Sequence, residues 1–347
     1  MNSKSFPIIL GILVIALLVF IGFRFFRSDF DLPTDGETSF IEAPTPEGDR
    51  GLDQGVGKIM ITDGVRHSIP LEEIISGGPP KDGIPSIDSP KFVSAAEANA
   101  WLNDNEPGIA FSRGNANRFY PYQIIVWHEI VNDQVGRERI LVTYCPLCLT
   151  GYVFDPVVKG ERVEFGTSGK LWKSNLVMYD RKTDSLWSQI LGEAVVGEMT
   201  GARLKVLLSD QVLYGNWKRK YPNGQVLSRD TGATRFYGSS PYGDYFSVTN
   251  LSLSLARPTD TRLPNDAFVF GIIVDGKAKA YSTEAVKAKG EVRDTFEGVS
   301  IILRHDRELD IVRMFKQLPD GREERFNPFS SFWFSWAAAH PDTELYK

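Results

Sequence analysis

The sequence lacks the features of several common functional classes. It has no stripe of basic residues and a formal net charge of -5, so we do not expect binding to nucleic acid. No long amphipathic helix and no second linker is visible in the soluble part, which favours one strand-rich domain. Cysteine is almost absent, because Cys145 and Cys148 are the only two in the chain. No cysteine is therefore available near the N-terminus for lipid attachment.

Two further absences limit the choice of cofactor. Leu149, not histidine, follows Cys148, so the pair is not a site for covalent haem attachment. The glycine-rich residues 166–169 are followed by Lys170 and Leu171, whereas a P-loop requires Lys-Ser or Lys-Thr after its second glycine. We therefore expect neither haem nor a nucleotide.

The N-terminal region predicts a membrane anchor and a tether. Residues 6–23 form an uncharged apolar run, close to the ~20 residues with which a helix crosses a bilayer. No small-residue cleavage site follows, so we expect a single-pass transmembrane helix within residues 1–27. Residues 28–57 are rich in Asp, Glu, Pro and Gly and predict a flexible tether. Residues 58–347 are expected to form a single soluble domain.

The soluble part predicts a mainly β fold with short helices, of the α+β class. Short runs rich in Val, Ile, Tyr and Phe alternate with turns that contain Gly, Asn, Asp and Pro. Residues 176–180 and 185–189 flank a polar turn and predict a hairpin. Helices are expected at residues 94–103, directly after Pro121, at residues 214–221 and at residues 332–340.

Weak internal similarities suggest that the domain has two related halves. Residues 120–145 align without gaps to residues 281–306, which pairs the first tyrosine and an internal aspartate of each block. Residues 216–227 and 335–346 form a second pair, in which a tryptophan and a helical turn precede a proline and a strand. The two offsets are 161 and 119, so the second half would lack about 42 residues around the predicted hairpin.

Two cysteines and one histidine form the candidate site. Cys145 and Cys148 follow an apolar strand, and such a pair can form a disulfide, act as a redox couple, or bind a metal. If the strand that carries His128 pairs with the strand that ends at Cys145, the imidazole and the sulfur atoms converge. We therefore predict a soft-metal site, for copper or zinc, made by Cys145, Cys148 and His128. Glu129 is expected on the opposite face as an ordinary surface or ion-paired acid.

Four sequence blocks stand in order along the chain: YPYQIIVWHEIVND, VTYCPLC, FGTSGKLWKSNLVMYDRKTDSLWSQ and FWFSWAAAHPDTELY. Together they resemble a prokaryotic family known as domain of unknown function 3179, over residues 57–347. One position departs from the family pattern, since Leu149 stands where glycine is expected. The resemblance implies an extracytoplasmic domain and names no reaction. With the anchor, it predicts a protein of the cell envelope or periplasm, tethered to the cell membrane.

Two functions of different classes follow from these observations. The first is metal handling or an oxidoreductase step at the predicted copper or zinc site. The second is a non-catalytic binding scaffold with a Cys145–Cys148 disulfide and an aromatic cleft. The aromatic residues available for this cleft are Trp172, Trp187, Tyr179, Tyr237, Tyr242 and Tyr245. The sequence leaves open whether the protein is an enzyme and which partner protein or small molecule it binds.

Overall fold

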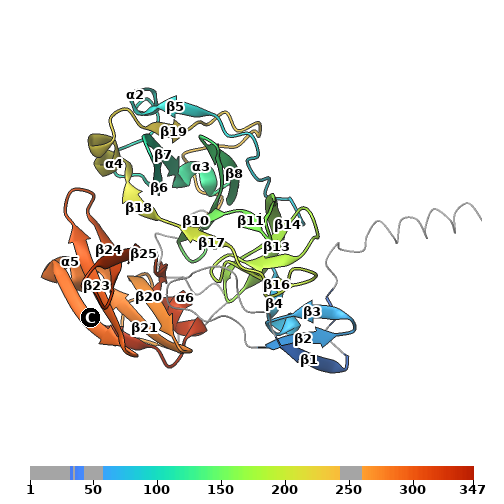
Figure 1. The fold of residues 1–347 in the computed structure, drawn as a ribbon. Coiled ribbons are helices and arrows are strands. Elements are labelled where there is room, and N and C mark those ends of the chain that lie inside the picture. Colours follow the sequence, from blue (N-terminus) through green and yellow to red (C-terminus); the bar gives the residue numbers. More distant parts are fainter. Residues whose placement is uncertain (1–31, 34–35, 43–57, 243–259) are drawn as a thin grey trace, which may run out of the picture.

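Strands dominate the described part of the protein. The computed structural model describes residues 32–33, 36–42, 58–242 and 260–347 (Figure 1). Its α-helices have four or seven residues each and are α2 (Ala95–Ala98), α3 (Tyr122–Ile125), α4 (Tyr214–Lys220), α5 (Thr283–Lys289) and α6 (Trp333–Ala339). Ser94 caps α2, and Glu97 completes a capping box with it, so the helix expected at residues 94–103 begins where the sequence predicts and ends earlier.

The sequence predicts a mainly β domain with short helices, of the α+β class, behind a transmembrane helix. The assignment to the α+β class and the transmembrane helix are wrong for the described chain, which is mainly β with five short α-helices. The described strands form six sheets, and the arrangement of these sheets resembles a β-propeller (Figure 1). The helices are too short to form a layer of their own. A seven-residue helix is about 10 Å long, whereas a bilayer core is about 30 Å thick, so none of the described helices crosses a membrane. The predicted anchor, residues 6–23, lies outside the described residues.

The chain contains two units, residues 92–227 and 268–346. Each unit has a sheet with the same arrangement of strands. A central hairpin pairs with one antiparallel strand on one side and one parallel strand on the other. The strand orders are β18-β6-β7-β19, extended by β5, and β26-β20-β21-β27. These strands are β5 (Phe92–Ser94), β6 (Pro107–Arg113), β7 (Ala116–Pro121), β18 (Ser209–Leu213), β19 (Gln225–Leu227), β20 (Phe268–Val274), β21 (Lys277–Ser282), β26 (Phe329–Phe332) and β27 (Glu344–Tyr346).

Each unit continues into a four-stranded antiparallel sheet. The strand orders are β17-β10-β9-β8 and β25-β24-β23-β22, with α3 and α5 in matching places before them. These strands are β8 (Ile130–Val135), β9 (Glu138–Cys145), β10 (Thr150–Asp155), β17 (Lys205–Leu207), β22 (Glu291–Phe296), β23 (Val299–Asp306), β24 (Ile311–Gln317) and β25 (Glu323–Phe326). The same order of elements thus occurs twice along the chain.

Matching side-chain contacts accompany the matching topology. Tyr120 donates a hydrogen bond of 2.5 Å to Asp133, and Tyr281 donates one of 2.8 Å to Asp294. A cation from the same strand as each tyrosine pairs with the aspartate. The two tyrosines, like the two aspartates, are 161 positions apart, which is the offset of the sequence alignment. These contacts tie the two sheets of each unit together.

The first unit contains an insertion between β10 and β17, which are neighbours in its four-stranded sheet. Residues 156–204 separate β10 from β17, whereas only residues 318–322 separate β24 from β25. The insertion supplies four strands to an eight-stranded sheet of order β1-β2-β3-β16-β15-β14-β13-β4, and it includes the predicted hairpin. Its elements are β11 (Val157–Val158), β12 (Glu161–Arg162), β13 (Phe165–Trp172), β14 (Asn175–Asp180), β15 (Leu186–Ser188) and β16 (Glu193–Val196). The N-terminal elements of this region are β1 (Thr38–Glu42), β2 (Lys58–Thr62), β3 (Val65–His67), a 3-10 turn (Leu71–Glu73) and β4 (Ile74–Ser76).

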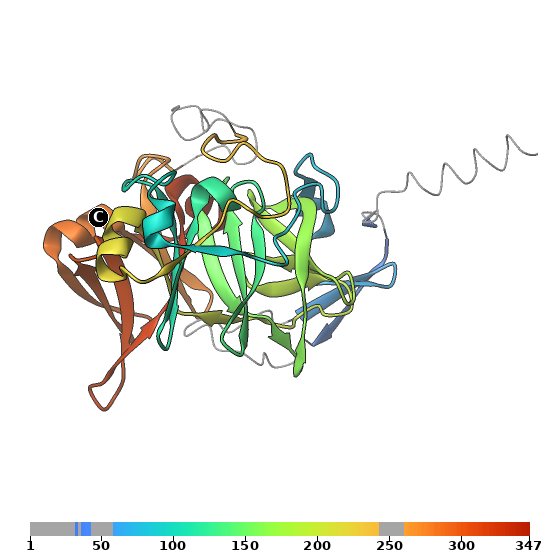
Figure 2. The same cartoon turned by 90° about the horizontal axis from the view of Figure 1, so that it is seen from above.

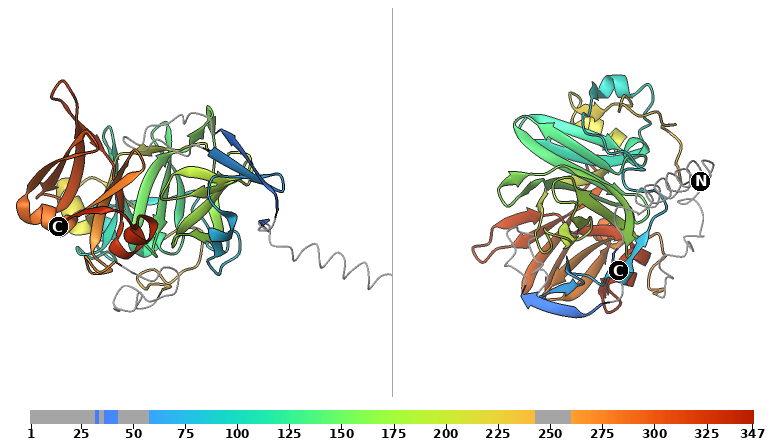
Figure 3. Two further views of the ribbon diagram at one scale, coloured as in Figure 1. Left: turned by 90° about the horizontal axis from the view of Figure 1, so that it is seen from below. Right: turned by 90° about the vertical axis from the view of Figure 1, so that its right-hand side faces the viewer.

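In Figure 1 the first unit lies above the second unit and above β1–β3, which lie at the lower left and the lower right. Figure 2 shows the second unit, in orange to red, at one end and β1–β3, in blue, at the other. The first unit and its insertion, in cyan to yellow, lie between them, and the view from below in Figure 3 shows the same order. The inserted strands β13 and β14 contact β8 and β9, so they stand next to the sheet that carries the two cysteines.

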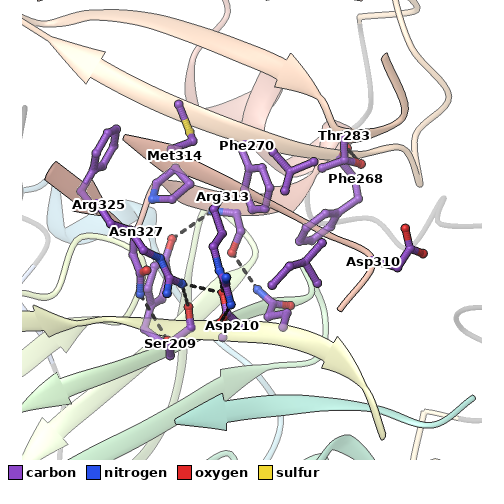
Figure 4. Close-up of a pocket in the computed structure, with 18 of the residues that line it drawn as sticks. Ser209, Asp210, Phe268, Phe270, Thr283, Asp310, Arg313, Met314, Arg325 and Asn327 are labelled. Carbon is purple, nitrogen blue, oxygen red and sulfur yellow. Dashed lines mark hydrogen bonds and ion pairs between the residues drawn. The ribbon is translucent and has the colours of Figure 1, made fainter. Parts of the chain in front are cut away.

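A charged cluster joins the two units. Asp210 on β18 binds Arg313 of β24 at 2.7 Å and Arg325 of β25 at 2.5 Å (Figure 4). The side chain of Asn327 also donates a hydrogen bond of 3.0 Å to the carbonyl of Leu207. These contacts line a small cavity of about 250 Å³ between the units. Because two arginines share one aspartate, the cluster fixes the second unit against the edge strand of the first.

Candidate dithiol site

Cys145 and Cys148 lie where the chain turns from β9 into β10. Cys145 is the last residue of β9 and is paired with Thr150, the first residue of β10. A strand, β10, rather than a helix follows the pair. Leu149, within the turn, has a φ of 57°, in the left-handed region where glycine is favoured. This conformation explains why glycine is expected at this position.

Both cysteines are free thiols in the protein interior. Cys145 is 1% exposed and Cys148 is 0% exposed. The sulfur of Cys145 lies 3.8 Å from the carbonyl oxygen of Ser174. The sulfur of Cys148 lies 3.2 Å from the hydroxyl of Thr150 and receives a hydrogen bond of 3.2 Å from Asn175. The two sulfur atoms therefore have different surroundings.

Asn175, at the start of β14, sits at the centre of a buried hydrogen-bond network. Its side-chain nitrogen lies 3.2 Å from the Cys148 sulfur, 2.9 Å from the Thr150 hydroxyl and 2.8 Å from the side-chain oxygen Oε1 of Gln189. An amide nitrogen carries two hydrogens, so it cannot donate fully to three acceptors at once. The Asn175 amide can therefore direct its hydrogen bond to the sulfur when Cys148 loses its proton.

These surroundings move the pKa values of the two thiols in opposite directions. Burial raises the pKa of Cys148, but hydrogen bonds from Cys145, Thr150 and Asn175 outweigh burial and hold the pKa below that of an ordinary thiol. Burial also raises the pKa of Cys145, and the neighbouring Cys148 and Glu129 raise it further. The pair thus combines one thiol that ionises readily with one that keeps its proton.

A cavity of about 730 Å³ lies beside the pair. Cys145 and Glu129 line it, and so do the polar residues Lys170, Ser174 and Arg235. Much of the remaining wall is apolar and is formed by Ile84, Val126, Trp127, Leu147, Leu171 and Phe334. Of the two cysteines, Cys145 is the one that lines this cavity.

Glu129 is a buried acid of the site, not the ordinary surface acid that the sequence predicts. Its side chain is 7% exposed, lines the cavity, and accepts a hydrogen bond of 3.2 Å from the hydroxyl of Tyr242. Burial raises the pKa of Glu129 to about 8, a hydrogen bond from Tyr242 opposes this rise, and the nearby Cys148 adds to it. The backbone φ of 59° is strained for glutamate, and such strain is concentrated at functional sites.

His128 makes two hydrogen bonds away from the cysteines. Nδ1 lies 2.7 Å from the carbonyl oxygen of Pro85, and Nε2 lies 2.7 Å from the hydroxyl of Tyr237. Strand β8 begins only at Ile130, because the left-handed backbone at Glu129 ends the strand geometry that the sequence suggests. Within the described ranges, no group of three or more His, Cys, Asp or Glu side chains is placed to hold a metal ion. The ligand role of His128 stays a prediction and requires the imidazole to leave one of these partners.

The aromatic residues proposed for a cleft have different positions. Tyr242 lines the cavity, Tyr237 binds His128, and Trp187 is buried in the core with no exposed surface. Tyr245 lies outside the described residues. Sequence reasoning did not identify Trp127, which lines the cavity and donates a hydrogen bond to the carbonyl of Ser239.

Sequence reasoning also missed the polar network behind Cys148. Thr150 and Asn175 are buried polar residues that begin β10 and β14, and Gln189 is a buried polar residue directly after β15. A polar residue in such a position is a usable signal, because a buried polar group requires a partner. The sequence does not show which residues hydrogen-bond to one another, however, because these residues are up to 39 positions apart.

The fold and the site define a mainly β protein with a buried dithiol beside a cavity. A family model described as "Protein of unknown function (DUF3179)" matches residues 81–343, which is more than half of the chain. The protein therefore belongs to this family, and the resemblance found in the sequence is confirmed. No curated protein and no solved structure matches the chain.

Proposed function

We propose that the protein is a thiol-disulfide oxidoreductase that acts on small-molecule disulfides. The proposal is carried by the two free thiols with opposite pKa shifts, which lie beside a cavity that also contains a buried carboxyl group. Cys145 and Cys148 are at most 1% exposed, so a disulfide on the surface of a folded protein could not reach them. A small disulfide fits the site better because the cavity gives it a path to Cys145.

In the first step the substrate disulfide is opened by Cys145. The ionised carboxylate of Glu129 takes the proton of Cys145, whose raised pKa makes a base necessary. The Cys145 thiolate attacks one sulfur of the substrate, the substrate S–S bond breaks, and one substrate thiolate leaves. A mixed disulfide between Cys145 and the other half of the substrate remains.

In the second step Cys148 releases the remaining half. The Cys148 thiolate, which Asn175 and Thr150 stabilise, attacks the sulfur of Cys145. The mixed disulfide breaks, a Cys145–Cys148 disulfide forms, and the second substrate thiolate leaves. Glu129 and solvent return the two protons, so two protein thiols and one disulfide give one protein disulfide and two small thiols.

An aromatic disulfide, 5,5'-dithiobis(2-nitrobenzoate), tests this sequence of steps. The reduced folded protein should release two equivalents of thionitrobenzoate and keep none bound, because the internal disulfide replaces the mixed one. Release is followed by absorbance and the bound group by intact mass. Cys145→Ser should react at least ~100-fold more slowly, because the cysteine that lines the cavity has lost its sulfur. The proposal is wrong if only the unfolded protein reacts, or if two thionitrobenzoate groups stay bound.

The same two sulfur atoms support a second candidate, the soft-metal site predicted from the sequence. Thiolates select Cu(I), and Cys145 and Cys148 are close enough to hydrogen-bond to each other. Reduced protein should then take up one Cu(I) in competition with a chelator, and replacement of both cysteines by serine should abolish uptake. His128→Ala weakens uptake only if the imidazole joins the site. Absence of stoichiometric uptake by the reduced wild-type protein would remove this candidate.

A further inference from the structure

The turn next to Cys145 carries a buried hydroxyl group that has no partner. Ser174 is 3% exposed, and within the described part of the chain its Oγ makes no hydrogen bond. The residue lines the same cavity as Cys145. Buried polar groups are nearly always hydrogen-bonded, so this hydroxyl lacks a partner that a ligand in the adjoining cavity can supply.

The backbone that holds this hydroxyl is strained. Lys173 and Ser174 form the two-residue loop of the β13–β14 hairpin, since Trp172 pairs directly with Asn175. Both loop residues have a positive φ, 49° and 62°, a conformation that Asn-Gly adopts far more readily in such turns. Backbone strain of this kind is concentrated at ligand sites. The turn thus keeps a serine hydroxyl in the cavity wall where glycine would be less strained.

The cavity also carries a surplus of positive charge. Lys170 and Arg235 line it, and neither is ion-paired with any residue that the structure describes. Glu129 is the one carboxylic acid in the described lining, and its pKa of about 8 keeps it largely neutral at pH 7. The two cations therefore face a mainly apolar wall without an anion that balances them.

We infer that this cavity binds an organic anion with an apolar body, which Lys170 and Arg235 bind by charge and Ser174 binds by a hydrogen bond. The apolar walls, including Trp127 and Leu171, would hold the body of the ligand. This inference rests on the proposed function for one detail: the substrate class is then a disulfide that carries a carboxylate or sulfonate. The binding site itself does not depend on the thiol chemistry.

Two dyes with the same ring system test the charge preference. One is 1-anilinonaphthalene-8-sulfonate, which is anionic, and the other is N-phenyl-1-naphthylamine, which lacks the sulfonate. Both are titrated by fluorescence into the full chain with Cys145→Ser and Cys148→Ser, so that no disulfide exchange can occur. Failure of the thiol reaction therefore leaves this measurement unaffected, and failure of dye binding leaves the thiol reaction unaffected.

In this background, Lys170→Gln and Arg235→Gln should each weaken the sulfonate dye about tenfold and leave the neutral dye unchanged, because charge-assisted contacts are lost. Lys159→Gln is the matched control, since Lys159 is an exposed lysine that does not line the cavity, and it should change neither dye. Equal weakening of both dyes, or no change in the sulfonate dye, overturns the inference.

Ser174→Ala separates ligand binding from a structural role. It should weaken the sulfonate dye several-fold while the melting temperature stays the same or rises, because the free protein loses a buried hydroxyl without a partner. A lower melting temperature with unchanged dye affinity would show that the hydroxyl serves the fold and would overturn its role in binding.

Discussion

Cys148→Ser should trap the substrate on Cys145. With 5,5'-dithiobis(2-nitrobenzoate), the variant should release one equivalent of thionitrobenzoate and keep the other bound as a mixed disulfide. The second release should slow by more than ~100-fold, because attack by a neighbouring thiolate is replaced by attack from solvent or from a second molecule. Absorbance gives the released equivalents, and intact mass gives the group that stays bound.

Two comparison variants make this result specific. Thr150→Val removes one hydroxyl next to the Cys148 sulfur but keeps both thiols, so the second release should slow and still go to completion. Cys145→Ser should trap no stable adduct at Cys148, which is fully buried. If Cys145→Ser traps the adduct and Cys148→Ser does not, the two cysteines have the opposite roles.

Glu129→Gln should slow the first release of thionitrobenzoate by about 100-fold at pH 8, the size of effect expected for a lost general base. Burial raises the pKa of Glu129 to about 8, so the carboxyl is protonated below this pH and can accept a proton above it. The wild-type rate should therefore rise with pH and level off above about pH 8. The variant should lack this rise, and an unchanged pH profile would exclude Glu129 as the base.

The same variant gives a second readout in folding stability. Because the folded-state pKa of Glu129 lies above the ordinary value of a glutamate, about 4.5, the folded protein binds this proton more tightly than the unfolded chain. The contribution to stability is complete below about pH 4.5 and is lost as the pH rises through about 8, by a few kcal/mol. Urea denaturation at several pH values should show this loss in the wild type and in Glu198→Gln, an exposed control, but not in Glu129→Gln.

The repeated unit could be predicted from the sequence because the residues that identify it are close together in the chain. Tyr120 and Asp133 are 13 positions apart, and Tyr281 and Asp294 keep the same spacing, since the pair joins neighbouring strands. The number of sheets could not be predicted in this way. Parallel pairing of β19 with β7 and antiparallel pairing of β13 with β4 join segments that are far apart in the sequence, and nothing local specifies them.

The site was predictable only in part, because the backbone of Glu129 departs from strand geometry. The cysteine pair stands out because the chain has no other cysteine. The neighbouring strand was extrapolated back through Glu129 to His128, and alternation of side chains then placed His128 beside Cys145. A left-handed backbone at Glu129 breaks that alternation, so Glu129 lines the cavity with Cys145 and His128 binds Pro85 and Tyr237. Positive φ at a non-glycine residue has no reliable signal in a single sequence.

A redox titration of the folded protein tests the central claim most directly. The protein is equilibrated in glutathione redox buffers of increasing potential, and free thiols are blocked and counted by mass. We predict one two-electron transition, roughly between -300 and -180 mV, in which Cys145 and Cys148 are lost together as an internal disulfide and return on reduction. If both thiols stay free in the folded protein at the most oxidising potential, while the unfolded chain forms the disulfide, the pair is not a redox centre.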